Sequence, residues 1–318
     1  MLALLLCLLP LAATAGVSCV YEIFTGSYCD SDGDCIGDLQ GILSRLDYIQ
    51  ALGTDGVWLT PVSPSPSYHK YDVTDYYNID PDFGTLADYD ALAEACKARG
   101  ITLLYDLVIN HTSAEHPWFQ AAVKSLQSGD LTDPYIDYYQ FTQSKGDYPV
   151  EGTDWYYAGD FGADMPELNL DSTAVRGEIA DIIAFWLSHG AGGFRLDAVT
   201  HYYDSQPESN RAFLAWLCET VKCIDPDAFI VGEAWTDSVA ILDLYQSGID
   251  ALFNFPLSST GSLSKAMQSE AGQSFANRIV AWQQSIEEIN PDAVAAPFLS
   301  NHDQGRIAGV LRLDLQQE

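Results

Sequence analysis

The sequence predicts an α/β fold, a (β/α)8 TIM barrel that is incomplete at its C-terminus and carries an inserted subdomain after its third strand. Short apolar runs alternate with helical stretches, an order that gives parallel strands joined by right-handed crossovers. No glycine-rich phosphate-binding turn follows the first run, which disfavours a doubly wound sheet. Polar side chains follow strand after strand, as they do at the active-site end of a barrel.

The order of the predicted elements follows from residue pattern. Strands are expected where apolar, β-branched and aromatic residues run together, at residues 20–24, 56–60, 102–109, 193–197, 229–233, 251–255 and 294–299. Helices are expected at residues 39–52, 86–99, 173–189, 210–222, 238–246 and 262–289. Gly53, Gly100 and Gly190 follow three of these helices, and glycine is the residue that most often ends a helix.

One long segment breaks the alternation. Residues 112–171 are rich in Trp, Tyr, Asp and Gly and read mainly as loop. A connection of this length between a strand and its helix predicts a small subdomain that overhangs the site. The expected organisation is therefore a signal peptide at 1–15, a first part of the barrel at 16–111, the inserted subdomain at 112–171 and a second part of the barrel at 172–318.

Charge and the N-terminus limit the partners and the location. The chain has 45 acidic and 14 basic residues, a formal net charge of −31, which excludes nucleic-acid binding through clustered basic residues and is compatible with a neutral substrate. The first twelve residues are almost wholly apolar and precede Ala13-Thr14-Ala15. This run is too short to span a bilayer and is typical of a secretory signal peptide. We therefore expect a secreted, extracellular protein with no membrane span, and a form lipid-anchored at Cys19 is the less favoured alternative. The sequence indicates no oligomeric state.

The segment Gly193-Phe194-Arg195-Leu196-Asp197 is the most informative one in the chain. Residues i and i+2 of a strand share a face, so Arg195 and Asp197 are expected side by side. A guanidinium beside a carboxylate favours the ionised carboxylate. A charged carboxylate fixed at a strand end is what a glycosidase needs as its nucleophile.

Four separated motifs resemble, in order, those of the α-amylase family of glycoside hydrolases. They are Asp106-Leu107-Val108-Ile109-Asn110-His111, the Gly193–Asp197 segment continued by Ala198-Val199-Thr200-His201, Gly232-Glu233-Ala234-Trp235, and Phe298-Leu299-Ser300-Asn301-His302-Asp303. A fifth, Met165-Pro166-Glu167-Leu168-Asn169-Leu170, is similar to a motif of members intermediate between oligo-1,6-glucosidases and neopullulanases. The resemblance covers nearly the whole mature length.

The resemblance implies a retaining mechanism. Asp197 would be the nucleophile, Glu233 the general acid and then base, and Asp303 would steady the transition state through sugar hydroxyls. Retention requires the Asp197 and Glu233 carboxyls to lie about 5–5.5 Å apart. Glu233 also needs a raised pKa, and crowding by the other two carboxylates is expected to raise it.

The resemblance also implies which residues bind substrate: His69, Tyr71, Asp72, His111, Arg195 and His302. Tyr71 would stack on the sugar at the cleavage point, and Asp72 would bind hydroxyls of the terminal sugar. His111 and His302 would hydrogen-bond the sugar in the cleavage subsite. Trp58 is expected to pack in the barrel, and Asp106 is expected to orient its neighbours.

An acidic loop predicts a calcium site. Carboxylates alternate around Gly33, and calcium prefers six to eight hard oxygen ligands. The spacing also resembles the calcium loop of oligo-1,6-glucosidase-like members, which implies as ligands Asp30, Asp32, Asp34, Asp38 and the carbonyl of Ile36. Spacing alone does not fix how the seven cysteines pair. We hypothesise a Cys29–Cys35 disulfide across this loop.

The predicted function is that of a secreted retaining α-glucan hydrolase. Ala198, after the nucleophile, favours α-1,4 bonds of starch or maltooligosaccharides. The alternatives are an α-glucosidase, a neopullulanase or a transglycosylase of the same family, and a truncated, non-catalytic glucan-binding barrel. The last arises because relatives continue into an eighth strand and a C-terminal β domain, whereas 15 residues follow Asp303 here. The barrel is therefore expected to lack both.

Overall fold

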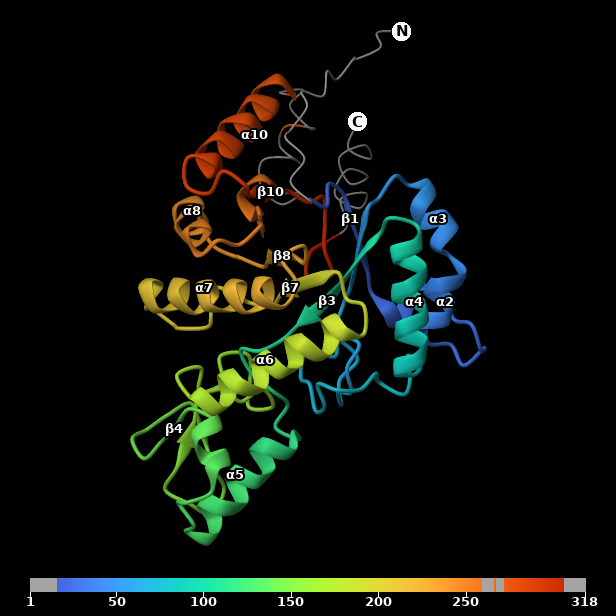
Figure 1. The fold of residues 1–318 in the computed structure, drawn as a ribbon. Helices are drawn as coiled ribbons and strands as arrows, with labels where there is room; N and C mark the ends of the chain where they lie inside the picture. Colours follow the sequence, from blue (N-terminus) through green and yellow to red (C-terminus); the bar gives the residue numbers. More distant parts are fainter. Residues whose placement is uncertain (1–15, 259–265, 267–271, 306–318) are drawn as a thin grey trace, which may run out of the picture.

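A curved, parallel seven-stranded sheet forms the centre of the molecule (Figure 1). The structure is a computed structural model that describes residues 16–258, 266 and 272–305. The strands, in sheet order, are β1 (Val20–Ile23), β2 (Gly56–Leu59), β3 (Thr102–Leu107), β7 (Gly193–Leu196), β8 (Phe229–Gly232), β9 (Ala251–Phe253) and β10 (Val294–Ala296). They match the seven predicted runs, and the incomplete barrel is confirmed. The predicted signal peptide lies outside the described residues.

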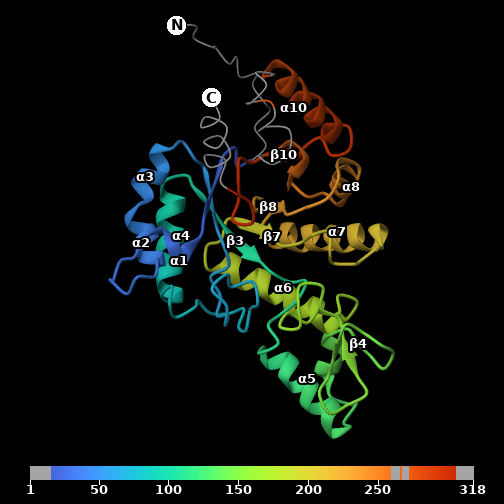
Figure 2. The same ribbon diagram turned by 180° about the vertical axis from the view of Figure 1, so that it is seen from behind.

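Helices cover the outer face of the sheet. They are α1 (Thr25–Tyr28), α2 (Leu39–Ser44), α3 (Leu46–Ala51), α4 (Leu86–Ala98), α6 (Thr173–Ser188), α7 (Pro207–Ile224), α8 (Ser238–Leu244) and α10 (Gly272–Glu287), with short 3-10 helices η2 (Tyr245–Ser247) and η3 (Phe255–Leu257). Figures 1 and 2 show α2, α3 and α4 on one side and α7, α8 and α10 on the other. The single helix predicted over 39–52 is two helices, because the backbone leaves the helical region at Arg45 (φ −108°, ψ 5°).

The segment between β3 and α6 is more regular than predicted. It contains α5 (Pro117–Ser128), the 3-10 helix η1 (Pro134–Tyr138) and a small antiparallel sheet of β4 (Phe141–Thr142), β6 (Tyr156–Tyr157) and β5 (Tyr148–Pro149). The sequence indicated mainly loop here, so this detail was wrong. Pro117 starts α5 beside a His116 cap, and Gly129 ends it at φ 77°. The boundaries 112 and 171 stay a prediction.

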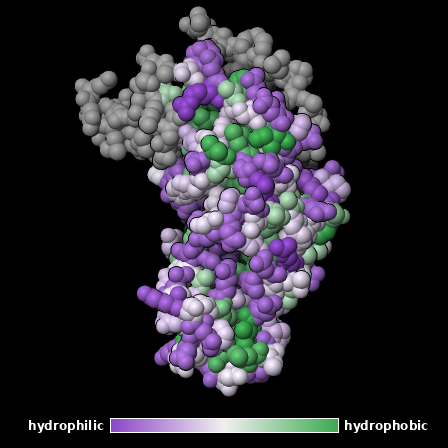
Figure 3. Space-filling model, turned by 90° about the vertical axis from the view of Figure 1, so that its left-hand side faces the viewer, coloured by the Kyte–Doolittle hydropathy of each residue, from purple (hydrophilic) through white to green (hydrophobic). Residues whose placement is uncertain are grey.

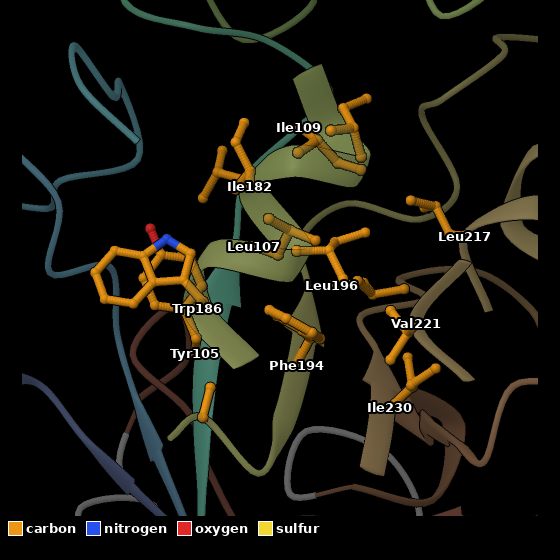
Figure 4. Close-up of a cluster of buried hydrophobic side chains, with 14 of the residues drawn as sticks. Tyr105, Leu107, Ile109, Ile182, Trp186, Phe194, Leu196, Leu217, Val221 and Ile230 are labelled. Atoms are coloured by element: carbon orange, nitrogen blue, oxygen red, sulfur yellow. The ribbon is translucent and has the colours of Figure 1, made fainter. Parts of the chain in front are cut away.

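Alternation along the strands gives the sheet two faces with different neighbours. The outward side chains of β3, β7 and β8 pack against α6 and α7 (Figure 4). The residues labelled there are Tyr105, Leu107, Ile109, Ile182, Trp186, Phe194, Leu196, Leu217, Val221 and Ile230. The inward face begins with a smaller apolar cluster that includes Leu104, Phe229 and Val231. Residues two positions further along each strand belong to the same face, and they are charged: Asp106 and Glu233.

Gly193 lets β7 and β8 approach closely. Its φ is 151°, a conformation that L side chains rarely adopt. A Cβ atom at this position would lie 1.9 Å from the carbonyl oxygen of Phe229, so any side chain would push the strands apart. The strand that carries Arg195 therefore depends on this glycine for its place in the sheet.

The surface is largely hydrophilic on the face shown in Figure 3, with apolar patches scattered over it. Of the helices that the structure describes, none combines the length and apolar character needed to cross a membrane. The six cysteines between Cys19 and Cys223 are all free. The hypothesised Cys29–Cys35 disulfide is therefore not formed in the structure, where Cys35 is exposed in a turn at φ 79°.

Candidate active site

Arg195 is the centre of the candidate site. Parallel pairing of β3 with β7 places Asp106 directly opposite Arg195, and Asp197 lies two residues further on the same face. Arg195 is fully buried. Its Nη1 atom lies 2.8 Å from Asp106 Oδ1 and 2.6 Å from Asp197 Oδ1. Its Nη2 atom lies 2.7 Å from Glu233 Oε2, so one guanidinium bonds three carboxylates.

The Arg195 guanidinium lies over two aromatic rings. Arg195 Cζ lies 4.8 Å from the ring centre of Trp58 and 5.5 Å from that of Tyr71. Trp58 Nε1–H and the Tyr71 hydroxyl both donate to Asp106 Oδ2, at 2.9 and 3.1 Å. Trp58 therefore packs inside the sheet, and Asp106 connects Arg195 to two aromatic rings. Burial raises the pKa of Asp106 to about 7, although the Arg195 charge opposes this.

Glu233 follows β8 and is 7% exposed. Burial raises the pKa of its carboxyl, the Arg195 charge opposes that rise, and the Asp197 charge adds to it. The pKa of Glu233 is therefore raised, as expected from the sequence, and burial is the main cause. Glu233 Oε2 also accepts the backbone N–H of Ala198 at 3.3 Å. Ala198 has a φ of 46°, a strained value for a residue with a side chain.

His302 and Asp303 reach the same site from the loop after β10. The His302 ring stacks on Tyr71, with 5.3 Å between ring centres and 12° between planes. His302 Nε2 lies 3.3 Å from Asp303 Oδ2. Burial raises the pKa of Asp303, and the Glu233 charge contributes to the rise. The structure thus brings together all three predicted catalytic residues with Arg195, Tyr71 and His302.

The remaining predicted substrate residues border this centre. The His69 ring stacks on Tyr71 at 6.1 Å, and its Nδ1 accepts the Tyr71 backbone N–H. Asp72 is buried and accepts hydrogen bonds from the hydroxyls of Ser65 and Ser67. His111 is 1% exposed, and neither of its ring nitrogens has a hydrogen-bond partner. Burial lowers the pKa of His111 to about 4, an effect that the adjacent Tyr71 backbone partly opposes. A neutral imidazole donates from one ring nitrogen and accepts at the other.

The acidic loop brings three of its four carboxylates together. Oxygens of Asp30, Asp32 and Asp38 lie within 4.8 Å of one another, a donor set that suits calcium. Asp34 lies outside this group, and its Oδ1 accepts the Ile36 backbone N–H at 2.7 Å. Asp30 accepts three backbone N–H groups, the shortest from Gly33 at 2.6 Å, and these bonds lower its pKa. Asp38 also caps α2 through the Gly41 N–H.

Sequence reasoning missed two groups near the site. Glu22, on β1, bonds His302 at 2.8 Å, and its only signal was an acidic residue inside an apolar strand. Asp160, from the inserted segment, lies 3.2 Å from His201, and Asp204 completes a second cluster of ionisable groups. Neither contact follows from sequence spacing, because each joins residues more than 40 positions apart.

Comparisons with known proteins agree with this geometry. Residues 22–317 match the family model "Alpha amylase, catalytic domain". "Alpha-amylase 3" of Dictyoglomus thermophilum is 40% identical over 295 residues, which cover 90% of this chain and 56% of that protein. "Oligo-1,6-glucosidase" of Parageobacillus thermoglucosidasius is 40% identical over 216 residues, 61% of this chain and 38% of that protein.

The structure of Eubacterium rectale Amy13B superimposes with a TM-score of 0.87 at 46% identity, covering 91% of this chain and 59% of that one. The chain thus spans little more than half the length of the relatives that it matches over most of its own length. The parallel sheet, the four motifs at its carboxyl end and these matches lead to one conclusion: the chain belongs to the α-amylase family of glycoside hydrolases.

Proposed function

We propose that this protein is a secreted retaining α-glucan hydrolase that cleaves α-1,4 bonds of starch or maltooligosaccharides by double displacement. One observation carries the proposal: a single buried guanidinium, that of Arg195, bonds the carboxylates of both Asp197 and Glu233. Retaining glycosidases hold two carboxyls about 5–5.5 Å apart, closer than the inverting enzymes do. Because Asp197 and Glu233 bond the two terminal nitrogens of one guanidinium, their carboxyls are held close together, which favours the shorter, retaining distance between them.

In the first step Asp197 acts as the nucleophile. Its carboxylate attacks the anomeric carbon while the carboxylic acid of Glu233 protonates the glycosidic oxygen that leaves. The bond from the anomeric carbon to that oxygen breaks, and a covalent glycosyl–enzyme forms. The raised pKa of Glu233 supports its role as acid, because a buried carboxyl holds its proton nearer to neutral pH.

In the second step Glu233 acts as the base. It takes a proton from water, the hydroxide oxygen attacks the anomeric carbon, and Asp197 leaves as a carboxylate. Two inversions retain the configuration. Asp303 and His302 face the same space and offer a carboxylate and an imidazole to sugar hydroxyls. The unpartnered His111 ring nitrogens and the Tyr71 ring supply further polar and flat surface.

Calcium would be held by the acidic loop. Asp30, Asp32 and Asp38 supply converging oxygens, and Asp34 with the Ile36 carbonyl would complete the set if the loop closes further around the ion. A divalent cation would relieve the repulsion among these carboxylates and stabilise the loop that precedes α2. Its proposed contribution is structural.

The proposed preference for α-1,4 bonds rests on Ala198. The oligo-1,6-glucosidase relative supports the alternative preference, for α-1,6 bonds.

The proposal that the protein is secreted rests on the apolar N-terminal run and its Ala13-Thr14-Ala15 site. N-terminal sequencing of protein exported by an expression host tests secretion. A mature chain that begins at Gly16 is the expected result, and an uncleaved chain retained in the cell would contradict it.

Product analysis tests the reaction. The protein is incubated with soluble starch, maltooligosaccharides and isomaltose, and products are followed by chromatography and by ¹H NMR of the first anomer released. We expect maltooligosaccharide cleavage with the α-anomer first and little cleavage of isomaltose. Asp197→Asn should abolish turnover, and Asp227→Asn, at an exposed turn before β8, serves as the matched control.

Each outcome of this experiment has a clear meaning. Equal activity of wild type and Asp197→Asn would refute the assignment of the nucleophile. A β-anomer as first product would refute retention, and isomaltose as the better substrate would establish the α-1,6 alternative. Absence of turnover by a folded chain would refute the proposed function for this chain.

A further inference from the structure

A carboxylate on the first strand contacts the candidate site from across the sheet. β1 and β10 are the two outermost strands in the sheet order. Glu22 lies on β1, and His302 lies in the loop after β10, 280 positions later. Glu22 Oε1 accepts two hydrogen bonds from His302, one from the backbone N–H at 3.2 Å and one from Nδ1 at 2.8 Å.

Two bonds to one carboxylate oxygen fix both the backbone and the ring of His302. The ring stacks on Tyr71 at 12° and meets Trp58 edge-on, with 5.6 Å between centres. Its Nδ1–H points to Glu22, which accepts hydrogen bonds and donates none when ionised. The other nitrogen, Nε2, therefore faces Asp303 at 3.3 Å. The side chains of both partners are mostly buried, with 12% of His302 and 19% of Glu22 exposed.

We propose that Glu22 is a positioning residue for the reaction, which holds His302 protonated at Nδ1 and aims its Nε2 atom at Asp303 and the sugar hydroxyls between them. This role rests on the proposed glycosidase function. Glu22 itself touches no reacting atom and acts through His302. A carboxylate that orients an imidazole by its far nitrogen also determines which nitrogen keeps the proton.

The surrounding charges favour a protonated imidazole. Burial alone would lower the pKa of His302, but Glu22 and Asp303 face the ring from two sides and together raise it. Arg195 opposes the protonated form. The charge of a protonated His302 also acts on Glu233, whose pKa it lowers. Loss of the Glu22 charge should therefore lower the His302 pKa and change the pH range in which Nε2 can donate.

The first test needs no activity. The imidazole signals of His302 are assigned in ¹⁵N–¹H spectra by comparison with His302→Asn, and are titrated in wild type, Glu22→Gln and Glu22→Ala. Glu22→Gln keeps an oxygen that accepts the Nδ1–H bond but removes the charge, so the titration midpoint should fall by about one pH unit or more. Glu22→Ala should also lose the fixed protonation at Nδ1. Glu219→Gln, at an exposed position of α7, is the control.

The second test separates orientation from charge. With a maltooligosaccharide substrate, Glu22→Ala should lower kcat/KM about tenfold or more, which corresponds to about 1.4 kcal/mol of transition-state binding. Glu22→Gln should retain most of kcat/KM below neutral pH and lose it as the pH rises, because its His302 deprotonates earlier. Glu219→Gln should match the wild type throughout.

The two tests can fail separately. An unchanged His302 midpoint and tautomer in Glu22→Ala would overturn the positioning role, whatever the activity. A shifted midpoint with unchanged kcat/KM and pH profile in both variants would reduce Glu22 to a link between the sheet edges, and the proposal would fail. If wild type has no turnover, the glycosidase assignment fails, while the NMR titration still decides whether Glu22 controls His302.

Discussion

Arg195 Nη2 and Glu233 Oε2 lie 2.7 Å apart, so the residue expected to orient the nucleophile also holds the proposed acid. The sequence placed Arg195 beside Asp197 through strand alternation, but the bond to Glu233 crosses to the next strand. A cation bonded to the acid should disfavour its protonation, yet burial outweighs this and raises the Glu233 pKa. The site thus combines the proposed nucleophile, which Arg195 holds, with a proposed acid whose pKa is raised in spite of the same cation.

Replacement of Arg195 by lysine should damage both activity and stability. A lysine ammonium cannot bond two carboxylates in the fixed fork of a guanidinium. We expect kcat/KM to fall by about a hundredfold or more, as for loss of a preorganised charge at other active sites. A single ammonium on a shorter side chain cannot keep all three bonds, so at least one of the buried carboxylates would lose its hydrogen-bond partner, which should lower the free energy of unfolding in urea by about 1–3 kcal/mol.

Arg211→Lys is the matched control for that change, because Arg211 pairs with Asp243 at 2.6 Å in a partly exposed position. Weakening this exposed ion pair should lower the free energy of unfolding by at most about 1 kcal/mol and leave kcat/KM unchanged. An Arg195→Lys protein with wild-type turnover would show that the three carboxylates do not depend on the guanidinium.

The pH dependence of turnover should report on Glu233. Because burial raises its pKa, the acid stays protonated to a higher pH than an ordinary glutamic acid, and activity should fall on the alkaline side as it ionises. Glu233→Gln should lower kcat/KM for maltooligosaccharides by about 10²–10⁴-fold and remove the alkaline limb. The measurement is kcat/KM across the acidic, neutral and mildly alkaline range.

An aryl α-glucoside with a good leaving group provides the internal comparison. Its departure needs little protonation, so Glu233→Gln should slow formation of its glycosyl–enzyme much less, as a pre-steady-state burst would show. Equal losses for both substrates would mean that Glu233 contributes something other than a proton to the leaving group.

The sequence predicted the seven strands because each is an apolar or β-branched run, and their order fixes which residues meet at the carboxyl ends. The expectation of loop in the inserted segment was wrong for a physical reason. The strands there are only two residues long and show no alternation, and α5 is defined by its caps, His116 and Gly129, as much as by its apolar face. Glu22 was missed because its contact spans 280 positions, and an acidic residue in an apolar strand does not by itself indicate a partner.

His116 should make stability depend on pH. Burial lowers its pKa to about 4, against about 6.5 in an unfolded chain. Between these values the unfolded state binds the proton that the folded state does not, so the free energy of unfolding should decrease as the pH falls from about 6.5 to 4. Each pH unit is worth about 1.4 kcal/mol, giving a loss of about 2–3 kcal/mol from this group.

His116→Asn tests this directly, because the asparagine oxygen can still accept the Trp118 backbone N–H that His116 Nδ1 accepts at 3.1 Å. Urea unfolding at about pH 8, where both side chains are neutral, gives the cost of the substitution alone. The wild type should be less far ahead of His116→Asn in free energy of unfolding at about pH 4.5, by about 2–3 kcal/mol, because only the wild type loses stability through this group. A constant difference across this range would contradict the buried, neutral His116.

Calcium should stabilise the folded chain through the acidic loop. At a calcium concentration about 100 times the Kd, binding to the folded state alone adds about 2.7 kcal/mol, which thermal unfolding with and without chelator would detect. Asp32→Asn is the cleanest variant, because Asp30 holds three backbone N–H groups and Asp38 caps α2. It should weaken calcium binding about tenfold or more in titration calorimetry, whereas Asp227→Asn should not.

Asp34→Asn then shows whether the loop rearranges. Asp34 lies outside the group formed by Asp30, Asp32 and Asp38, so its substitution should leave the Kd unchanged if the loop keeps this conformation, and should weaken calcium binding if the loop closes around the ion as proposed. A loss equal to that of Asp32→Asn would mean that Asp34 turns inward from the Ile36 N–H when the ion binds. If calcium fails to raise the unfolding midpoint of the wild type, the backbone N–H groups around Asp30 are sufficient to hold the loop, and the proposed site is wrong.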